Sequence, residues 1–358
     1  MNPAFLVRFR PQGPWRIGSN TGARDRVEFL FHSDALYSAV THIMQRLGRL
    51  DDWLAATAGA GAEPAVRLSS LFPALDELRF VPPPKSLWPP PPSAKVRWSN
   101  ARFVPLAVVR DLLAEKPLNE NRWCLDGASG CLLPNDPRYQ QGPFRAALRS
   151  HAAVDRLRGS AVEVHRTACL EFSEGGGFWG IASFSGEAAA AAWAEPLRTA
   201  FRLLADSGLG GERSLGWGRS AQPEFTDGVL PDLIVPAPAA PPAEPVAVEG
   251  DAEPPAPRPA PETAYWLLSL FSPAAGDAVD WQRGNYALAE RAGRIESPVR
   301  SGEAKKVVRM VEEGSVLVAA APPTGAAPDV APEGFPHPVY RCGFALALPV
   351  PYRQGGAA

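Results

Sequence analysis

The chain has 358 residues, of which 46% are hydrophobic and 21% are charged, and its formal net charge is −2. This length allows two ordinary domains with a core each, and the composition is that of a soluble globular protein. The four cysteines form no CxxC pair, which argues against zinc and against a disulfide framework. We therefore expect no metal or other cofactor, no membrane partner and a cytoplasmic setting.

Charge is distributed unevenly along the chain. Residues 226–262 hold seven acidic residues and one arginine, and residues 229–262 hold eleven prolines. Such a stretch is expected to form a semi-extended linker and not a core. Between Arg79 and Arg110, in contrast, six basic residues occur without an acidic one. The net charge thus hides a basic folded part beside an acidic linker.

The first elements are predicted from hydrophobic spacing. Residues 4–10 alternate as a strand does, and a glycine- and arginine-rich loop follows over 11–26. Apolar residues at helical spacing predict a helix over about 34–48, with Ser33 as its N-cap. Residues 64–142 contain a proline run and a possible short helix over 104–115. The prolines argue against a central strand, so we expect an extended, partly exposed insertion.

The next elements complete a repeating pattern. Residues 162–172 and 178–184 read as two strands joined in a hairpin by S-E-G-G-G. A helix is predicted over 187–206, with Gly208 as its C-cap, and a strand over 219–225. Without the insertion, the order is the βαββαβ order of a ferredoxin-like (RRM-like) domain.

Several strands are predicted after the linker, at 265–271, 307–311, 314–320 and 343–348, while 287–294 is a helix or a strand. The fold class is therefore α+β, with two tandem ferredoxin-like domains. The predicted boundaries are 1–228, which includes the insertion at about 64–142, then the linker 229–262, and the smaller domain 263–358.

The most unusual stretch is G-L-G-G-E-R-S-L-G-W-G, residues 208–218. Glycines permit positive φ angles and close approach of another backbone, and successive exposed N–H groups form an anion-binding nest. Arg213 adds a charged fork and Trp217 a stacking surface, a combination that suits nucleic acid. A purely structural tight turn explains the glycines equally well. The spacing fits neither a Walker loop nor a dinucleotide fingerprint.

Four stretches together resemble RAMP proteins, and most closely the family of the fourth Csm subunit of type III-A CRISPR effector complexes. They are F-H-S-D-A-L-Y-S-A-V (31–40), H-A-A-V-D-R-L-R-G (151–159), the glycine loop, and E-E-G-S-V-L (312–317) with V-Y-R-C-G-F-A-L-A-L near the C-terminus. The proline-rich insertion and the acidic linker depart from the family pattern as we know it.

The resemblance implies a non-catalytic subunit that binds the 5′ handle of the crRNA. Its expected partners are the large polymerase- and nuclease-bearing subunit and the backbone RAMP subunits, with target RNA met only indirectly. An endoribonuclease that processes precursor crRNA, a handle-binding subunit of another type III complex, and a scaffold that binds protein alone remain as alternatives.

The candidate RNA-binding residues lie in five stretches. His32 is the one candidate general base for the nuclease alternative, although a local packing role explains it as well. The basic insertion interleaves cations with Trp98, and it reads either as a backbone-tracking arm or as a solvated loop. The arginines at 145–158 could bind phosphates, pair with acidic residues of a partner, or simply be solvated surface residues. The full expected set is Arg16, His32, Ser33, Lys85, Lys95, Arg97, Trp98, Arg102, Arg145, Arg149, Arg156, Gly208, Gly210, Gly211, Arg213, Ser214, Gly216, Trp217 and Gly218.

Overall fold

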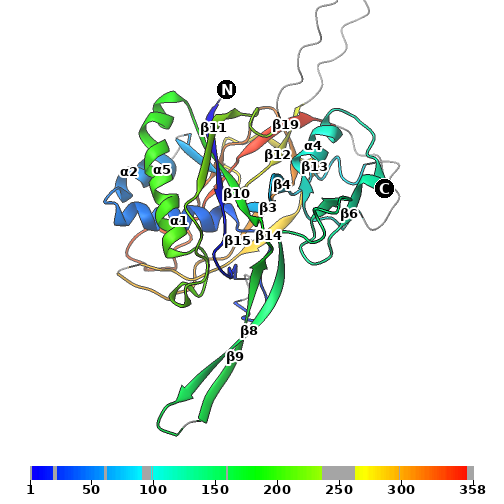
Figure 1. The fold of residues 1–358 in the computed structure, drawn as a ribbon. Helices are drawn as coiled ribbons and strands as arrows, with labels where there is room; N and C mark the ends of the chain where they lie inside the picture. Colours follow the sequence, from blue (N-terminus) through cyan, green and yellow to red (C-terminus); the bar gives the residue numbers. More distant parts are fainter. Residues whose placement is uncertain are drawn as a thin grey trace, which may run out of the picture.

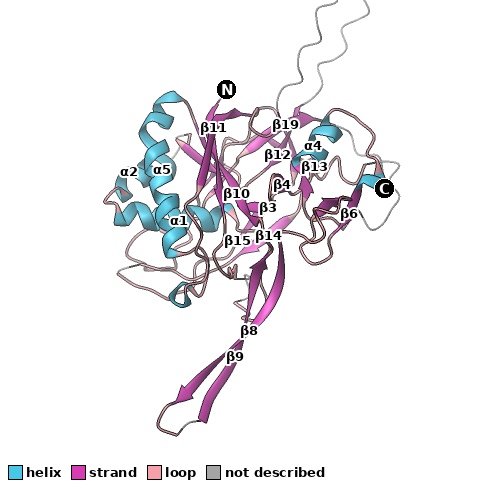
Figure 2. Ribbon diagram, viewed as in Figure 1, coloured by secondary structure: helices cyan, strands magenta, loops and turns pink. Residues whose placement is uncertain are grey.

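The computed structural model describes residues 2–18, 22–59, 63–90, 98, 100–158, 160–235, 263–297 and 299–352. These residues form a mixed fold with few helices and many strands (Figures 1 and 2). The helices described are α1 (Ser33–Arg46), α2 (Leu50–Thr57), α4 (Leu106–Leu113) and α5 (Glu187–Ser207), with short 3-10 turns η1 (Glu120–Arg122) and η2 (Arg213–Leu215). No helix in these ranges is long and apolar enough to cross a membrane.

A seven-stranded antiparallel sheet forms the centre of the molecule. Its order is β11-β1-β10-β3-β4-β5, and β2 also pairs with β10. The bounds are β1 (Asn2–Phe9), β2 (Val66–Leu68), β3 (Phe72–Leu75), β4 (Leu78–Val81), β5 (Val104–Pro105), β10 (Gly176–Phe184) and β11 (Glu224–Leu230). Strand β1 is apolar on both faces over most of its length, because both faces of the sheet are covered.

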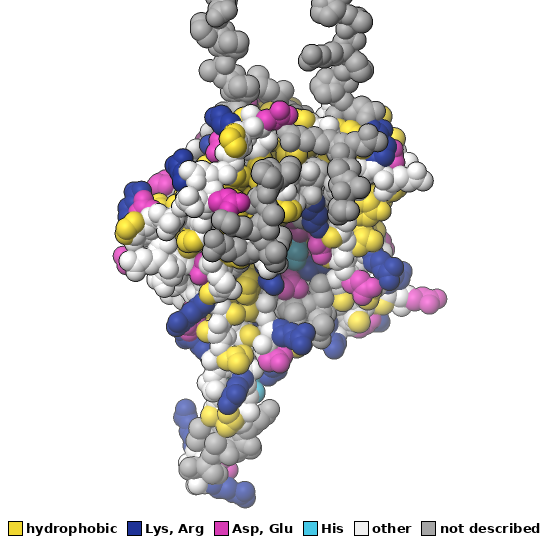
Figure 3. All heavy atoms as spheres, turned by 90° about the vertical axis from the view of Figure 1, so that its right-hand side faces the viewer, with side chains coloured by type: hydrophobic (Ala, Val, Ile, Leu, Met, Phe, Trp, Pro, Cys, Tyr) yellow, Lys and Arg dark blue, Asp and Glu magenta, His cyan; other side chains and the backbone are white. Residues whose placement is uncertain are grey.

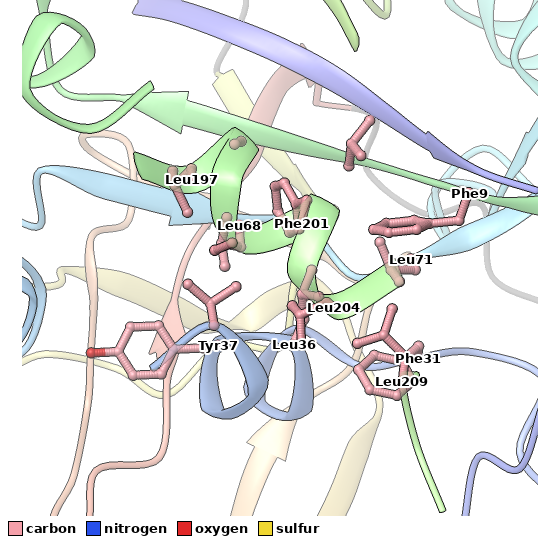
Figure 4. Packing of buried hydrophobic residues seen from close by; sticks show 14 of the residues in the cluster. Phe9, Phe31, Leu36, Tyr37, Leu68, Leu71, Leu197, Phe201, Leu204 and Leu209 are labelled. Atoms are coloured by element: carbon pink, nitrogen blue, oxygen red, sulfur yellow. The ribbon is translucent and has the colours of Figure 1, made fainter. Parts of the chain in front are cut away.

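Helices α1 and α5 cover one face of this sheet. Phe5 and Phe9 of β1 both pack against Phe201 of α5 in edge-to-face geometry, with ring centroids 6.1 and 5.9 Å apart. Figure 4 shows the same layer from close by, with Leu36 and Tyr37 on α1 below Leu197, Phe201 and Leu204 on α5.

A second sheet, from the C-terminal part, covers the other face. Its order is β13-β16-β12-β19, with bounds β12 (Thr263–Leu267), β13 (Val279–Asn285), β16 (Val316–Ala319) and β19 (Ala347–Pro351). Leu6 and Trp179 of the first sheet share a buried cluster with Trp266 and Leu348 of the second. The N-terminal and C-terminal parts therefore share a core. Shorter pairs are β6 (Trp123–Leu125) with β7 (Leu132–Pro134), β14 (Leu288–Arg291) with β15 (Val308–Val311), and β17 (Gly325–Ala326) with β18 (Gly343–Phe344).

A long two-stranded hairpin projects from this body (Figure 1). It consists of β8 (Phe144–Asp155) and β9 (Ser160–Phe172), paired from Phe144↔Phe172 outward. Phe144 packs in the main core at the root of the hairpin, whereas Leu148 and Val164 farther out are exposed. The hairpin is thus anchored at one end and solvated along the rest.

Several predicted elements are confirmed. Helices α1 and α5 match the predictions over 34–48 and 187–206, and the backbone N–H of Gly208 donates to the carbonyl of Leu204, as a C-cap does. Helix α4 falls within 104–115, and β14 shows that the ambiguous segment 287–294 contains a strand.

Other predictions are wrong. The strand at 162–172 pairs with β8 and not with β10, because β8 lies directly before it in the chain and offers a longer partner. The segment 66–81 belongs to the main sheet, contrary to the expected insertion, since the proline run begins only where β4 ends at Val81. The closing strand begins at Glu224 and not at 219, and it extends past residue 228.

The element order predicted for the C-terminal part is also wrong. Residues 263–297 and 299–352 contain no helix, so this part lacks the two helices of a βαββαβ domain. Its sheet buries one face against the N-terminal sheet, which replaces the cover that helices would give. Most of the acidic linker lies outside the described residues.

Candidate nucleic-acid interface

The glycine loop is a tight structural turn. Gly208, Gly210, Gly216 and Gly218 all have positive φ angles, between 78° and 91°. A Cβ on Gly210 would lie 2.3 Å from the carbonyl oxygen of Arg16, and one on Gly218 would lie 2.1 Å from that of Leu209. Glycine is therefore required at these positions both for the backbone angle and for the close approach.

Three of the loop N–H groups that were expected to bind an anion form hydrogen bonds inside the protein instead. The N–H groups of Leu209, Gly211 and Gly218 donate to the carbonyls of Gly218, Arg16 and Pro14, at 3.0, 2.8 and 2.9 Å. The first of these bonds closes the loop on itself, the other two hold it against residues 14–16, and none of the three donors is directed at solvent. The structural alternative thus accounts for the glycines.

The side chains of the glycine loop differ in their exposure to solvent. Ser214 is exposed, and the guanidinium of Arg213 is 41% exposed and lies 3.4 Å from the carboxylate of Glu296 in the C-terminal part. Trp217 is only 5% exposed, so its ring packs inside the protein. Arg213 and Ser214 are therefore exposed polar residues of this loop that can reach a ligand directly.

Trp217 joins the glycine loop to the hairpin. The ring of His151 on β8 lies 5.6 Å from that of Trp217 and 5.3 Å from that of His165 on β9, with which it is stacked. His151 and His165 face each other in the hairpin register. This row of three rings fixes one face of the hairpin to the loop.

The same face of the hairpin carries arginines. Residues two apart share a strand face, so Arg145 and Arg149 lie on the side of His151. Both guanidiniums bind the carboxylate of Glu171, at 3.2 and 2.9 Å, and both remain largely exposed. One carboxylate between two cations leaves this face with a net positive charge.

The tip of the hairpin combines cations with an apolar residue. Arg156 and Arg158 are exposed in the turn, and Leu157 between them is 98% exposed. The guanidinium of Arg158 lies 3.8 Å from Asp155.

Arg16 and Trp98 are not surface residues, and the expectation that they contact RNA directly is wrong. The guanidinium of Arg16 is buried and donates to the carbonyls of Ala23, Arg24 and Ala168, at 2.9 to 3.1 Å. Trp98 is 1% exposed and lies parallel to Trp88, with ring centroids 6.4 Å apart. Both side chains stabilise the fold instead.

The H-S-D stretch at the start of α1 binds the C-terminal part. The Nδ1 of His32 lies 2.9 Å from Glu313, and the hydroxyl of Ser33 accepts a hydrogen bond from the N–H of Leu270 at 3.0 Å. Asp34 binds Arg291 through both carboxylate oxygens, at 2.9 and 3.1 Å, and also binds Arg341. Ser33 is buried within the helix, and His32 occupies the N-cap without a side-chain cap bond, so the prediction of a Ser33 cap is wrong.

Electrostatics keep His32 charged. Burial alone would lower its pKa, but the carboxylates of Glu313 and Glu28 outweigh burial and raise the pKa to about 10. The same imidazolium helps to lower the pKa of Glu313 against the effect of burial. His32 is therefore an imidazolium at neutral pH, the form that cannot accept a proton as a general base.

A cleft of about 580 Å³ lies between the two parts beside this cluster. Phe29, Trp88 and several prolines supply apolar walls, and Lys85 and Arg102 supply cations. Lys85 lies 3.6 Å from Glu312, and the guanidinium of Arg102 lies over the ring of Phe29 at 5.2 Å. Figure 3 shows a hollow on this side of the body, with side chains of both charges around it.

The structure thus divides the predicted site into groups. Arg145 and Arg149 lie on the hairpin face that contacts Trp217 through His151, whereas His32, Lys85 and Arg102 line the cleft. Lys95 and Arg97 lie outside the described residues. Within the described ranges, no group of three His, Cys, Asp or Glu residues could hold a metal ion.

Sequence reasoning missed the C-terminal partners of the H-S-D stretch. Glu313, Arg291 and Arg341 lie more than 250 residues from their partners in the chain, and local patterns do not reveal such pairs. A signal existed for two of them, because Glu313 and Arg341 fall inside the stretches 312–317 and 339–348 that carried the family resemblance.

We compared the sequence with protein-family models and the structure with solved structures. Residues 261–350 match the family model of the CRISPR Csm4 C-terminal domain. A chain in the crystal structure of a Csm3-Csm4 subcomplex of the type III-A CRISPR-Cas interference complex aligns with a TM-score of 0.59 and 15% identity, and the alignment covers 99% of this chain and 100% of that one.

Two structures of Csm1-Csm4 cassettes, one in complex with pppApA and one with cA4, align with TM-scores of 0.54 and 0.55. Each is 17% identical and covers 99% of this chain and 100% of the other. A search of curated proteins gives no match. The predicted resemblance is confirmed: residues 261–350 match the Csm4 C-terminal family, and almost the whole chain has the fold of a chain in these Csm4-containing complexes.

Proposed function

We propose that this chain is a non-catalytic subunit of a type III-A CRISPR interference complex that binds the 5′ handle of the crRNA. It would bridge a large polymerase- and nuclease-type subunit to the backbone RAMP subunits, in the cytoplasm, and meet target RNA only through the guide. Support comes from the similar structures, which contain Csm4 together with Csm3 or with Csm1.

One observation carries the RNA-binding part of this proposal. The projecting hairpin has a cationic face with Arg145 and Arg149, and that face meets the glycine loop through the contact of His151 with Trp217. Cations that track phosphates are usual components of a single-strand site, and the buried ring of Trp217 fixes this cationic face beside the glycine loop. The exposed tip residues Arg156 and Leu157 extend the surface beyond the body.

The cleft between the two parts suits an unpaired base. The exposed guanidinium of Arg102, which lies over the ring of Phe29, offers a planar stacking surface, and Lys85 at the same cleft would bind a phosphate. Both parts of the chain line this cleft, so its width depends on the H-S-D contacts beside it. The handle would then contact the hairpin, the glycine loop residue Arg213 and the cleft.

The cleft chemistry does not favour the endoribonuclease alternative. A nuclease of this type needs a base for the ribose 2′-hydroxyl, and His32 already carries a proton that two carboxylates stabilise. A charged histidine between Glu28 and Glu313 serves instead as an ion-pair partner that joins the two parts.

We also infer the domain organisation. The N-terminal part, up to about residue 228, is proposed as a ferredoxin-like unit, which its order of β1, α1, β3, β10, α5 and β11 supports. The C-terminal part from about residue 263 would be a smaller unit packed on its sheet.

RNA binding across a salt series tests the proposal. A crRNA with its handle should bind more tightly than the same RNA without the handle, and each of Arg149→Ala and Arg156→Ala should flatten the log–log salt dependence by up to about one unit. Arg46→Ala, which removes an exposed cation at the end of α1, is the matched control and should leave the slope unchanged. Equal slopes for all variants, or loss of intact RNA on incubation, would contradict the proposal.

A further inference from the structure

Four arginines form a row at the open end of the main sheet. We call Arg8, Arg10, Arg79 and Arg110 the arginine row. Strand residues alternate between faces, so Arg8 shares a face with Leu6, which is buried under the C-terminal sheet. Arg79 lies directly opposite Ala74, another residue of that buried face. The same face is therefore apolar where the second sheet covers it and cationic where the cover ends.

A small recess of about 130 Å³ lies within the row. Arg8, Arg10 and Arg79 line it, together with the carboxylates of Glu77 and Glu224. Trp179 lies opposite Arg8 in the strand register and is 1% exposed, so its ring forms a rigid wall of the recess.

The row has fewer counter-charges than cations. Arg10 forms a two-point contact with Glu224, with nitrogen–oxygen distances of 2.6 and 3.3 Å. Arg8 donates only to the carbonyl of Gly175 at 3.3 Å, and its buried Nε has no hydrogen-bond partner in the described part of the chain. The guanidinium of Arg79 likewise has no ion-pair or hydrogen-bond partner among the described residues. A buried guanidinium nitrogen without an acceptor is unfavourable unless a ligand supplies one.

The pKa values point in the same direction. Burial, and then the neighbouring Arg10, lower the pKa of Arg8. Burial, and then Arg79, lower the pKa of Arg110. Both guanidiniums therefore lie in an environment that a further negative charge would relieve.

The chemistry of the row favours protein over RNA. No exposed aromatic residue lines the recess, whereas single-stranded RNA sites usually pair cations with stacking rings. Glu77 and Glu224 would repel a continuous phosphate backbone, but mixed charges are common where two proteins align their surfaces. The row also lies on the sheet face opposite helix α5, from whose end the glycine loop starts.

We propose that the arginine row docks an acidic segment of a partner protein, with one carboxylate bound between Arg8 and Arg79. The geometry of a guanidinium fork matches a carboxylate, and the Nε of Arg8 would gain its missing acceptor. This inference rests on the proposed function in one respect, namely that the chain works as a subunit of a larger complex.

Assembly measurements with a charge reversal test the inference. Arg79→Glu is chosen because the side chain of Arg79 has no hydrogen-bond or ion-pair partner in the described part of this chain whose loss would disturb the fold. We expect its affinity for the separately purified large or backbone subunit to fall at least tenfold, with crRNA affinity unchanged. Arg122→Glu reverses an exposed arginine outside the row and should assemble normally. Full assembly of Arg79→Glu, or a selective loss of its RNA affinity, would overturn the inference.

Cross-linking identifies the carboxylate directly. Arg79→Lys keeps the charge and supplies an amine that a carbodiimide links to a nearby carboxylate. In the assembled complex we expect a link from position 79 to an Asp or Glu of a partner subunit, detected by mass spectrometry. Links only to Glu77 or Glu224 of this chain would refute the docking site, while leaving handle binding unaffected.

Discussion

The Nδ1 of His32 lies 2.9 Å from the Oε1 of Glu313, and this contact joins the first helix to the C-terminal part. The next two residues make contacts of the same kind, since Ser33 accepts from the N–H of Leu270 and Asp34 binds Arg291. Three consecutive side chains thus fix the relative position of the two parts. Because both parts line the neighbouring cleft, these contacts also determine its shape. The buried polar cluster is in this way linked to the proposed RNA site.

Asp34→Asn should destabilise the protein strongly. The carboxylate of Asp34 is buried between Arg291 and Arg341, and its removal leaves two guanidiniums without their shared counter-charge. Loss of one partner of a buried ion pair typically costs about 3–5 kcal/mol. Urea unfolding measures the difference. Asp51→Asn, at an exposed position in the first turn of α2, is the control and should change the free energy of unfolding by less than about 1 kcal/mol.

The ion pair of His32 with Glu313 predicts that the stability of the protein depends on pH. The pKa of His32 is about 10 in the folded protein and 6.5 for an ordinary histidine. Below pH 6.5 both states hold the proton and the contribution to stability is complete. As pH rises toward 10 the folded state alone retains the proton, so the free energy of unfolding should fall, by up to about 1.4 kcal/mol per pH unit.

Unfolding of His32→Gln between pH 7 and 9.5 (roughly the window in which one site changes protonation on unfolding) checks this dependence. The variant should be less stable than the wild type at neutral pH, and the difference should shrink as pH rises. His42→Gln replaces a histidine outside the cluster and should follow the wild-type profile. A constant difference between His32→Gln and the wild type would show that His32 does not hold the extra proton.

The glycine loop should tolerate alanine at one position and not at another. Gly210 has a φ of +87°, and its Cβ would lie 2.3 Å from a carbonyl oxygen. Gly216 has a φ of +78°, but its Cβ would meet open space. Gly216→Ala should therefore cost about 1 kcal/mol of stability from backbone strain alone, and Gly210→Ala clearly more. Gly210→Ala with Gly211→Ala should also weaken crRNA retention, because the loop would shift and move the exposed guanidinium of Arg213 with it. Equal thermal stability of Gly210→Ala and Gly216→Ala would contradict this account.

Regular helices were predictable from the sequence, and strand partners were not. Helices α1 and α5 follow from apolar spacing and from the glycine that ends α5. Strand β8 contains alanines and arginines without clear alternation, and its extended form depends on pairing with β9. The projecting hairpin was therefore missed, although its arginines were selected as candidates.

The candidate site was predictable in its composition and not in its exposure. Arg213 and Arg149 are on the surface as expected, whereas Arg16 is buried although its type and setting are similar. The difference arises from tertiary contacts: Arg16 finds three backbone carbonyls, one of them 152 residues away. No single-sequence pattern distinguishes an arginine that binds phosphate from one that binds such carbonyls.

Trp98→Ala and Arg102→Ala separate the structural role of the basic insertion from its RNA role. Trp98 is buried against Trp88, so its truncation should cost about 3–5 kcal/mol of stability. Arg102 is exposed at the cleft above Phe29, so Arg102→Ala should leave stability nearly unchanged. It should flatten the salt dependence of crRNA binding by up to about one unit. Thermal unfolding and filter binding are measured on both variants, with Trp98→Phe as the variant that keeps most of the packing. A stable Trp98→Ala protein that has lost RNA affinity would show instead that this ring stacks on RNA.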